Sequence, residues 1–155
     1  MTPQSAQGRL HQLADRHQLA QLAEPNLGAA RELHDDAAAH GRGVPALIEV
    51  GDHSGAVLLA YELSRKVALG MLLANGWRPA GGEGEHRITF EAAGILLIGQ
   101  ARKALSDASY LRQQRNDNMY RQERADPDAA AEANALAERV ITHALPALRR
   151  LTHPG

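Results

Sequence analysis

Hydrophobic side chains recur along most of this chain every three or four residues, the spacing that places them on one face of an α-helix. This pattern predicts amphipathic helices over residues 5–23, 27–40, 86–98 and 101–122. A last helix is expected to begin after Asp126-Pro127, since Asp is a favoured N-cap and Pro suits the first helical turn.

Residues 53–75 differ from the other predicted helices, because they are hydrophobic on nearly every side. Asp52 or Ser54 can cap the start of this helix, and Asn75-Gly76 is a typical C-terminal signal. A helix that is apolar all round is buried on several faces. We therefore expect a central helix, or one that also packs against a second subunit.

Glycine and proline residues mark the expected breaks between helices. Gly41-Arg42-Gly43 is predicted to end the second helix, and residues 44–51 fit either a helical turn or an extended connector. Residues 81–84 (Gly-Gly-Glu-Gly) predict a loop, and the absence of a following Lys-Ser/Thr excludes a P-loop. Pro146 is expected to kink or fray the last helix.

The composition supports helices over strands. Hydrophobic residues make up 44% of the 155 residues, but aromatic residues only 3%, and sheets favour aromatic and β-branched residues. We predict one compact all-α domain, an up-and-down helical bundle. Residues 51–155 form its main part, and residues 1–50 form an N-terminal helical extension packed on it without contributing chemistry.

Charge and cysteine content narrow the classes of function. There is no cysteine, which excludes disulfides and thiol chemistry. No signal peptide and no membrane-spanning run is apparent, so a cytoplasmic protein without a membrane partner is expected. The net charge of −1 leaves nucleic-acid binding to a local patch. Residues 101–124 offer one, with six basic and three acidic side chains: Arg102, Lys103, Arg112, Arg115, Arg121 and Arg124 against Asp107, Asp117 and Glu123.

Four histidines lie in the first forty residues, as two pairs spaced by six: His11 and His17, and His34 and His40. A spacing of six does not place two imidazoles on one helix face, as a spacing of four does. We therefore expect solvated histidines, no metal site and no cofactor.

Arg115 falls near the middle of the hydrophobic stripe of the helix predicted over residues 101–122, and it is the one local inconsistency in that helix. On a helical wheel, Ala104, Ala108, Leu111 and Met119 lie within about 40° of it. A guanidinium in that position must be paired, hydrated in a cleft or offered to an anion, because burying it alone is costly. One open alternative is structural, an ion pair between Arg115 and a carboxylate such as Glu62 or Glu91. A purely structural or protein-interaction role then remains for the chain.

Three blocks of the sequence resemble the HEPN (higher-eukaryote and prokaryote nucleotide-binding) domain family. Residues 55–79 are similar to the helix that reads A-Y-x-x-A-R-K-A-x-x-x-L-L-x-x-x-G-L-R-P in actinobacterial members. Residues 84–86 (Gly-Glu-His) resemble the turn before the next helix of these members, and residues 115–120 resemble their R-N-D-x-x-Y. The resemblance covers about two thirds of the chain.

The resemblance implies a helical bundle that forms a homodimer. Many members are metal-independent endoribonucleases that act as toxins and are encoded beside a nucleotidyltransferase. In these enzymes an Arg and a His from each subunit converge in a positively charged cleft. RNA supplies its own 2′-hydroxyl nucleophile, so proton transfer and anion stabilisation suffice. The expected ligand is RNA or a nucleotide, and a nucleotidyltransferase is the expected partner.

The sequence departs from the family motif at Tyr120, which stands where the motif has His. A phenol, with an ordinary pKa of about 10, is a poor general base at neutral pH. We therefore predict an RNA- or nucleotide-binding protein, with an active endoribonuclease toxin as the alternative and Tyr120 or Tyr110 as a candidate site of nucleotidylation. The candidate catalytic residues are Arg115, Asn116 and Tyr120. The candidate phosphate-binding residues are Arg112, Arg115, Arg121, Arg65, Lys66 and His86.

Overall fold

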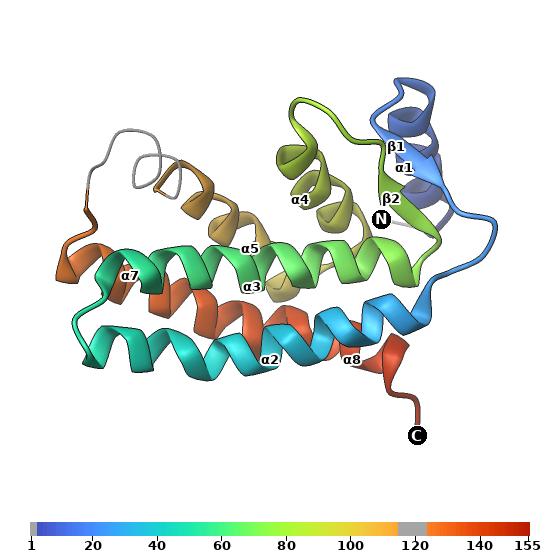
Figure 1. Ribbon diagram of the computed structural model, residues 1–155. Helices are drawn as coiled ribbons and strands as arrows, with labels where there is room; N and C mark the ends of the chain where they lie inside the picture. The colour runs from blue at the N-terminus through green and yellow to red at the C-terminus, as the bar shows by residue number, and fades with distance from the viewer. Residues whose placement is uncertain (1–2, 115–123) are drawn as a thin grey trace.

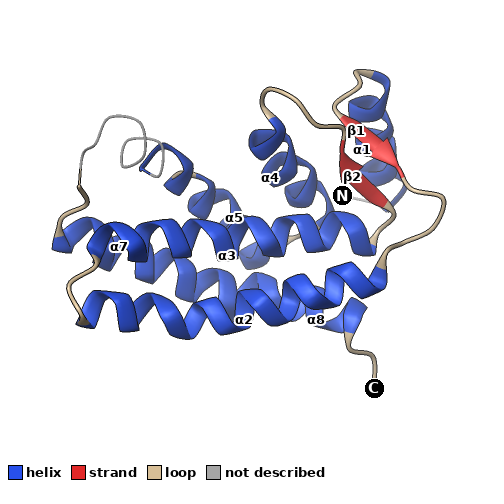
Figure 2. Cartoon of the chain, in the orientation of Figure 1, coloured by secondary structure: helices blue, strands red, loops and turns tan. Residues whose placement is uncertain are grey.

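The structure, a computed structural model, describes residues 3–114 and 124–155 (Figure 1). Its elements are α1 (Pro3–Asp15), β1 (Leu19–Gln21), α2 (Leu27–Glu49), α3 (His53–Ala74), β2 (Trp77–Pro79), α4 (Glu85–Leu96), α5 (Gly99–Ser109), α7 (Pro127–Arg139), the π-helical turn η1 (Val140–Ala144) and α8 (Leu145–Thr152). The predicted all-α bundle is confirmed, with one short two-stranded sheet added (Figure 2).

The long helices α2 and α3 lie side by side and antiparallel, and α7, η1 and α8 pack along them (Figure 1). α3 has buried residues along its whole length, as a sequence that is hydrophobic on nearly every side predicts. Its ends are also as predicted: Asp52 accepts a hydrogen bond from the Gly55 amide at 2.9 Å, and Gly76 has a left-handed φ of 85°. The division expected at residue 50 stays a prediction, and α2 contributes Ala30, Ala37 and Val44 to the main core.

The predicted end of the second helix at residues 41–43 is wrong, because α2 continues through Pro45 to Glu49. The glycines serve packing here. A Cβ added to Gly43 would lie 2.8 Å from Leu59 Cδ2 of α3, so a larger residue here would require the Leu59 side chain to move. Tertiary packing thus overrides the weak intrinsic helix propensity of this segment.

The predicted helix over residues 5–23 is wrong in its second half. α1 ends at Asp15, His17 takes a left-handed φ of 60°, and β1 pairs antiparallel with β2 in the register Leu19 to Pro79. The strand places its first residue beside Trp77 in a second hydrophobic cluster. That cluster comprises Leu10, Leu13, Leu19, Leu72, Trp77, Ile88, Ala92 and Ile95.

The helix predicted over residues 101–122 is interrupted within its described part. α5 ends at Ser109, Tyr110 forms a turn, and residues 111–114 are helical again. The Ser109 hydroxyl donates to the Ser106 carbonyl at 2.6 Å, a local bond that competes with the helical ladder. The hydrophobic stripe itself is confirmed at Ala104, Ala108 and Leu111, which are fully buried.

The C-terminal helix begins as predicted, with Asp126 accepting from the Ala129 amide at 2.8 Å. The expected irregularity at Pro146 takes the form of η1, a turn of π-helix directly before it. In this turn the Leu145 amide donates to the Val140 carbonyl five residues back. Since a proline ring collides with the carbonyl four residues before it, a wider turn relieves the conflict.

Candidate anion-binding cleft

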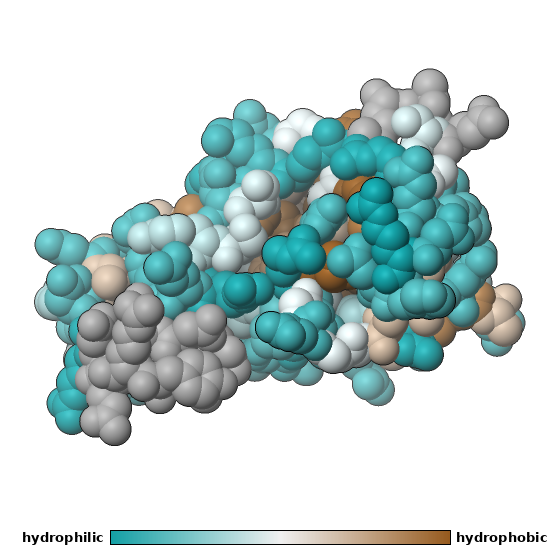
Figure 3. Space-filling model, turned by 90° about the horizontal axis from the view of Figure 1, so that it is seen from above, coloured by the Kyte–Doolittle hydropathy of each residue, from teal (hydrophilic) through white to brown (hydrophobic). Residues whose placement is uncertain are grey.

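A cleft of about 430 Å³ opens where α4 and α5 diverge from their short connection. Seen from the side of the molecule on which α4 and α5 lie, the surface is hollowed, with hydrophobic atoms at the floor and hydrophilic side chains around it (Figure 3). The cleft is lined by Arg9, Arg87, Phe90, Glu91, Gly94, Ile95, Arg102, Ser106, Ser109 and Arg112.

The lining of this cleft is strongly basic. Among the described residues that line it, four arginines face one carboxylate, Glu91, an excess of three positive charges on a chain whose net charge is −1. The arginines come from three elements and one helical turn: Arg9 from α1, Arg87 from α4, Arg102 from α5 and Arg112 from residues 111–114. A positively lined concavity concentrates anions through its field.

Arg102 sits at the junction of the two helices that form the cleft. Its Nε donates to the carbonyls of Gly94 at 2.8 Å and Leu97 at 2.9 Å, at the C-terminal end of α4. These carbonyls would otherwise lack a partner, as helix ends leave four of them free. The Nη2 of Arg102 is buried and has no hydrogen-bond partner among the described residues, so the guanidinium keeps unused donor capacity.

The other cleft arginines differ in how they are paired. Arg87 Nη1 lies 2.9 Å from Glu91 Oε2, one helical turn away, in an exposed ion pair. Such surface pairs contribute little and exchange readily for another anion. Arg112 is half-buried and makes no hydrogen bond or ion pair with the part of the chain that the structure describes. It is therefore the best placed of these side chains to bind a phosphate.

A second hollow of about 720 Å³ adjoins the cleft and shares Arg87 and Arg112 with it. The rest of its lining is residues 82–86, the glycine-rich turn and the start of α4. Glu83 and Glu85 balance the two arginines here, so the excess of positive charge belongs to the first cleft.

His86 lies in this second hollow and is held by α3. The Tyr61 hydroxyl lies 2.7 Å from His86 Nδ1, and the two rings stack with centroids 5.9 Å apart. Tyr61 is fully buried, so this contact fixes the orientation of the imidazole. Arg112 and His86, both predicted from the sequence as phosphate-binding residues, thus line the same hollow.

The structure does not bring Arg65 and Lys66 into the lining of either hollow. Arg65 binds Glu62 through two bonds, of 2.9 and 3.1 Å, and the Glu62 hydrogen bond raises the pKa of the Arg65 guanidinium above its usual value. Lys66 Nζ lies 3.2 Å from Asp36 Oδ2 and 3.0 Å from His40 Nε2. Burial, and then the charge of Lys66, lower the pKa of His40.

The remaining candidates, Arg115, Asn116, Tyr120 and Arg121, lie outside the described residues. The ion pair considered between Arg115 and Glu62 or Glu91 therefore stays a prediction.

Sequence reasoning missed Arg9, Arg87, Ser106 and Ser109 as neighbours of Arg112. None belongs to a motif, and only the packing of α1, α4 and α5 brings them together. The local basic excess did point to Arg102, although not to its place at the junction of two helices.

Comparison of the chain with protein-family models, with curated proteins and with solved structures finds no match. None of the helices within residues 3–114 and 124–155 has the length and apolar character needed to cross a membrane. The basic lining of the cleft is therefore the feature that points to a function.

Proposed function

We propose that this protein binds RNA, with its phosphates in the arginine-lined cleft between α4 and α5. The observation that carries the proposal is the gathering of Arg9, Arg87, Arg102 and Arg112 around one concavity, with Glu91 as the one carboxylate among its described lining residues. Guanidinium groups bind phosphate through planar pairs of N–H donors, and phosphate contacts dominate nucleic-acid affinity.

An extended ligand fits better than a single small anion. Arg87 and Arg112 border both hollows, so basic side chains continue from one concavity to the next. A strand of RNA places phosphates at successive positions and can use both. The resemblance to the HEPN family supports RNA, and it adds a homodimer and a nucleotidyltransferase partner to the proposal.

Binding of a labelled single-stranded RNA, followed by fluorescence anisotropy in EDTA at several salt concentrations, tests the proposal. Arg112→Ala should weaken binding about 10-fold and reduce the slope of log affinity against log salt by about 1, because one phosphate contact is lost. Arg150→Ala is the matched control, since Arg150 is an exposed arginine of α8 outside both hollows. It should bind as wild type does.

Equal losses in Arg112→Ala and Arg150→Ala would indicate only diffuse charge attraction, and absence of binding by the wild type would refute the proposal. Competition with unlabelled ATP separates RNA from a nucleotide as the ligand. Displacement of RNA by a concentration of ATP comparable to that of RNA nucleotides would identify the nucleotide instead.

Metal-independent RNA cleavage is the second candidate, favoured by the placement of His86. Its ring is oriented by Tyr61 and lines a hollow with Arg112, so a proton-transfer group and a phosphate-binding group face one space. The same mixtures, analysed on denaturing gels, would show cleavage that His86→Gln abolishes while RNA binding persists. Cleavage that persists in His86→Gln would exclude this role.

A further inference from the structure

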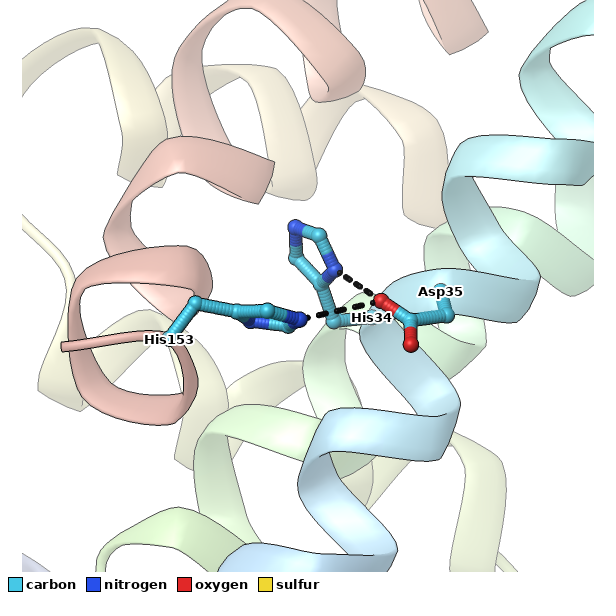
Figure 4. A group of neighbouring side chains, drawn as sticks. All are labelled: His34, Asp35 and His153. Carbon is cyan, nitrogen blue, oxygen red and sulfur yellow. Dashed lines mark hydrogen bonds and ion pairs between the residues drawn. The ribbon is translucent and has the colours of Figure 1, made fainter. Parts of the chain in front are cut away.

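A group of three side chains lies where the end of α8 meets the second turn of α2, away from the residues that line the cleft (Figure 4). His34 Nδ1 is 2.9 Å and His153 Nε2 is 3.1 Å from the same atom, Asp35 Oδ1. The three potential ligand atoms all lie within 4.8 Å of one another. Both imidazole rings point toward one carboxylate oxygen (Figure 4).

The proton on His153 can be assigned from its neighbour Thr152. The buried Thr152 hydroxyl donates its only proton to the Leu148 carbonyl at 2.9 Å. Its oxygen must therefore accept from His153 Nδ1, 2.8 Å away. A neutral His153 then presents the lone pair of Nε2 to Asp35 Oδ1.

Two acceptor atoms 3.1 Å apart repel each other unless a positive species lies between them. Either a proton, which would make His153 an imidazolium, or a metal cation can supply it. The second imidazole favours the cation, because His34 Nδ1 converges on the same point. The Thr152–His153 bond occupies the second ring nitrogen of His153, as an outer-shell acceptor does in a metal-binding histidine.

We propose that His34, Asp35 and His153 bind a divalent transition-metal cation, with Zn²⁺ as the best fit. Two imidazole nitrogens and one carboxylate are ligands that zinc favours, whereas Mg²⁺ and Ca²⁺ prefer oxygen alone. Bonds of about 2.0–2.1 Å in a tetrahedral site separate the ligand atoms by about 3.3 Å. The contacts of 2.9 and 3.1 Å to Asp35 would open by a few tenths of an ångström, and the two imidazole nitrogens lie within 4.8 Å of each other.

The site would leave one coordination position open to water. The Asp35 side chain is 60% exposed, whereas His34 is buried. Three protein ligands with an accessible fourth position fit tetrahedral zinc. Bound metal would fasten the C-terminal end of α8 to α2.

Isothermal titration of the untagged, EDTA-treated and desalted protein with ZnCl₂, in the presence of MgCl₂, tests the proposal. The wild type should bind one Zn²⁺ per chain. Asp35→Asn and His153→Ala should each weaken binding at least about 10-fold, and Thr152→Val about 10- to 100-fold through the loss of the orienting bond. His143→Ala removes an exposed histidine of η1 and should bind zinc as the wild type does.

Asp35→Asn is the decisive variant, because its exposed side chain can change without disturbing the core, and circular dichroism verifies that it folds. Absence of zinc binding by the wild type would overturn the proposal and leave a histidine–carboxylate ion pair. Unchanged affinity in folded Asp35→Asn and His153→Ala would overturn it as well, since zinc would then bind elsewhere.

Discussion

The charge of the cleft comes from a few individual side chains, and only some of them could be predicted from the sequence. Arg112 and His86 could be singled out from local charge and from motif resemblance, and they line one hollow. Arg65 and Lys66 carry the same charge but bind Glu62 and Asp36 instead. A sequence shows that a charge is present, but only packing determines whether a carboxylate neutralises it.

The histidines illustrate the same limit. The spacing of six residues between His34 and His40 does not suit a metal site on one helix face, so the sequence predicts a solvated His34. It is buried, and its partner His153 lies at the opposite end of the chain. Spacing rules detect ligands on one helix, and they cannot detect ligands that two helices bring together.

The ion pairs of Asp107 should make the stability of the protein depend on pH. It accepts from Arg139 at 2.8 Å and from Lys103 at 3.3 Å, and these bonds, Arg139 first, lower its pKa. A carboxyl whose pKa is lower in the folded state stabilises the fold above its unfolded pKa. Asp107→Asn should therefore reduce the free energy of unfolding at pH 7.

The difference between wild type and Asp107→Asn should disappear as the pH falls below about 3.8 and through the lowered pKa of the folded state. Urea unfolding at a series of pH values measures it. Asp15→Asn removes an exposed carboxylate that has no ion pair among the described residues. Its free energy of unfolding should stay close to that of the wild type at every pH of the series. A constant difference for Asp107→Asn would contradict the prediction.

Among the secondary-structure elements, hydrophobic periodicity predicts which segments are helices. The ends of a helix can be predicted only where the sequence contains a capping residue. Asp52 and Asp126 cap α3 and α7 as predicted. The errors fall where long-range contacts decide, as with β1, which pairs with β2 some sixty residues later, and α2, whose glycines allow close packing. Neither contact is visible in a local window of sequence.

Gly70 lies where α3 and α8 pack closely against each other. A Cβ at this position would lie 2.7 Å from Leu148 Cδ2 and 3.2 Å from its Cδ1, and Leu148 is fully buried. Gly70→Ala should therefore destabilise the protein by about 1–3 kcal/mol despite the better helix propensity of alanine.

Gly8→Ala is the matched control, because Gly8 lies within α1 with no atom within 4 Å of an added Cβ. It should stabilise by about 0.5–1 kcal/mol. Chemical denaturation of both variants measures the two effects. Stabilisation of similar size in both would show that α8 does not pack closely on α3 at this point.

Across the molecule as a whole, the described residues form two hydrophobic clusters rather than one. The larger spans α2, α3, α4, α5, α7, η1 and α8, and the smaller, which contains Trp77, joins α1 and the strands to α3 and α4. Trp77 is the single tryptophan and is 1% exposed, so its fluorescence reports on the smaller cluster.

Leu10→Ala should test how firmly the two clusters are coupled. Leu10 is fully buried in the smaller cluster, and its truncation should cost about 2–5 kcal/mol there. We expect the unfolding transition seen by tryptophan fluorescence to move to lower denaturant than the one seen by far-UV circular dichroism. Coincident transitions would mean that the clusters unfold as one unit.

The pairing of β1 with β2 also constrains the order of folding. Leu19 and Pro79 are 60 positions apart, and joining the ends of a free segment of that length costs about 3–4 kcal/mol in chain entropy. Once α2 and α3 have associated, their outer ends already lie near each other, and most of that entropy has been lost. We therefore expect the small sheet to form late, joining the two ends of the helical hairpin, and Trp77 to become buried only after the hairpin has formed.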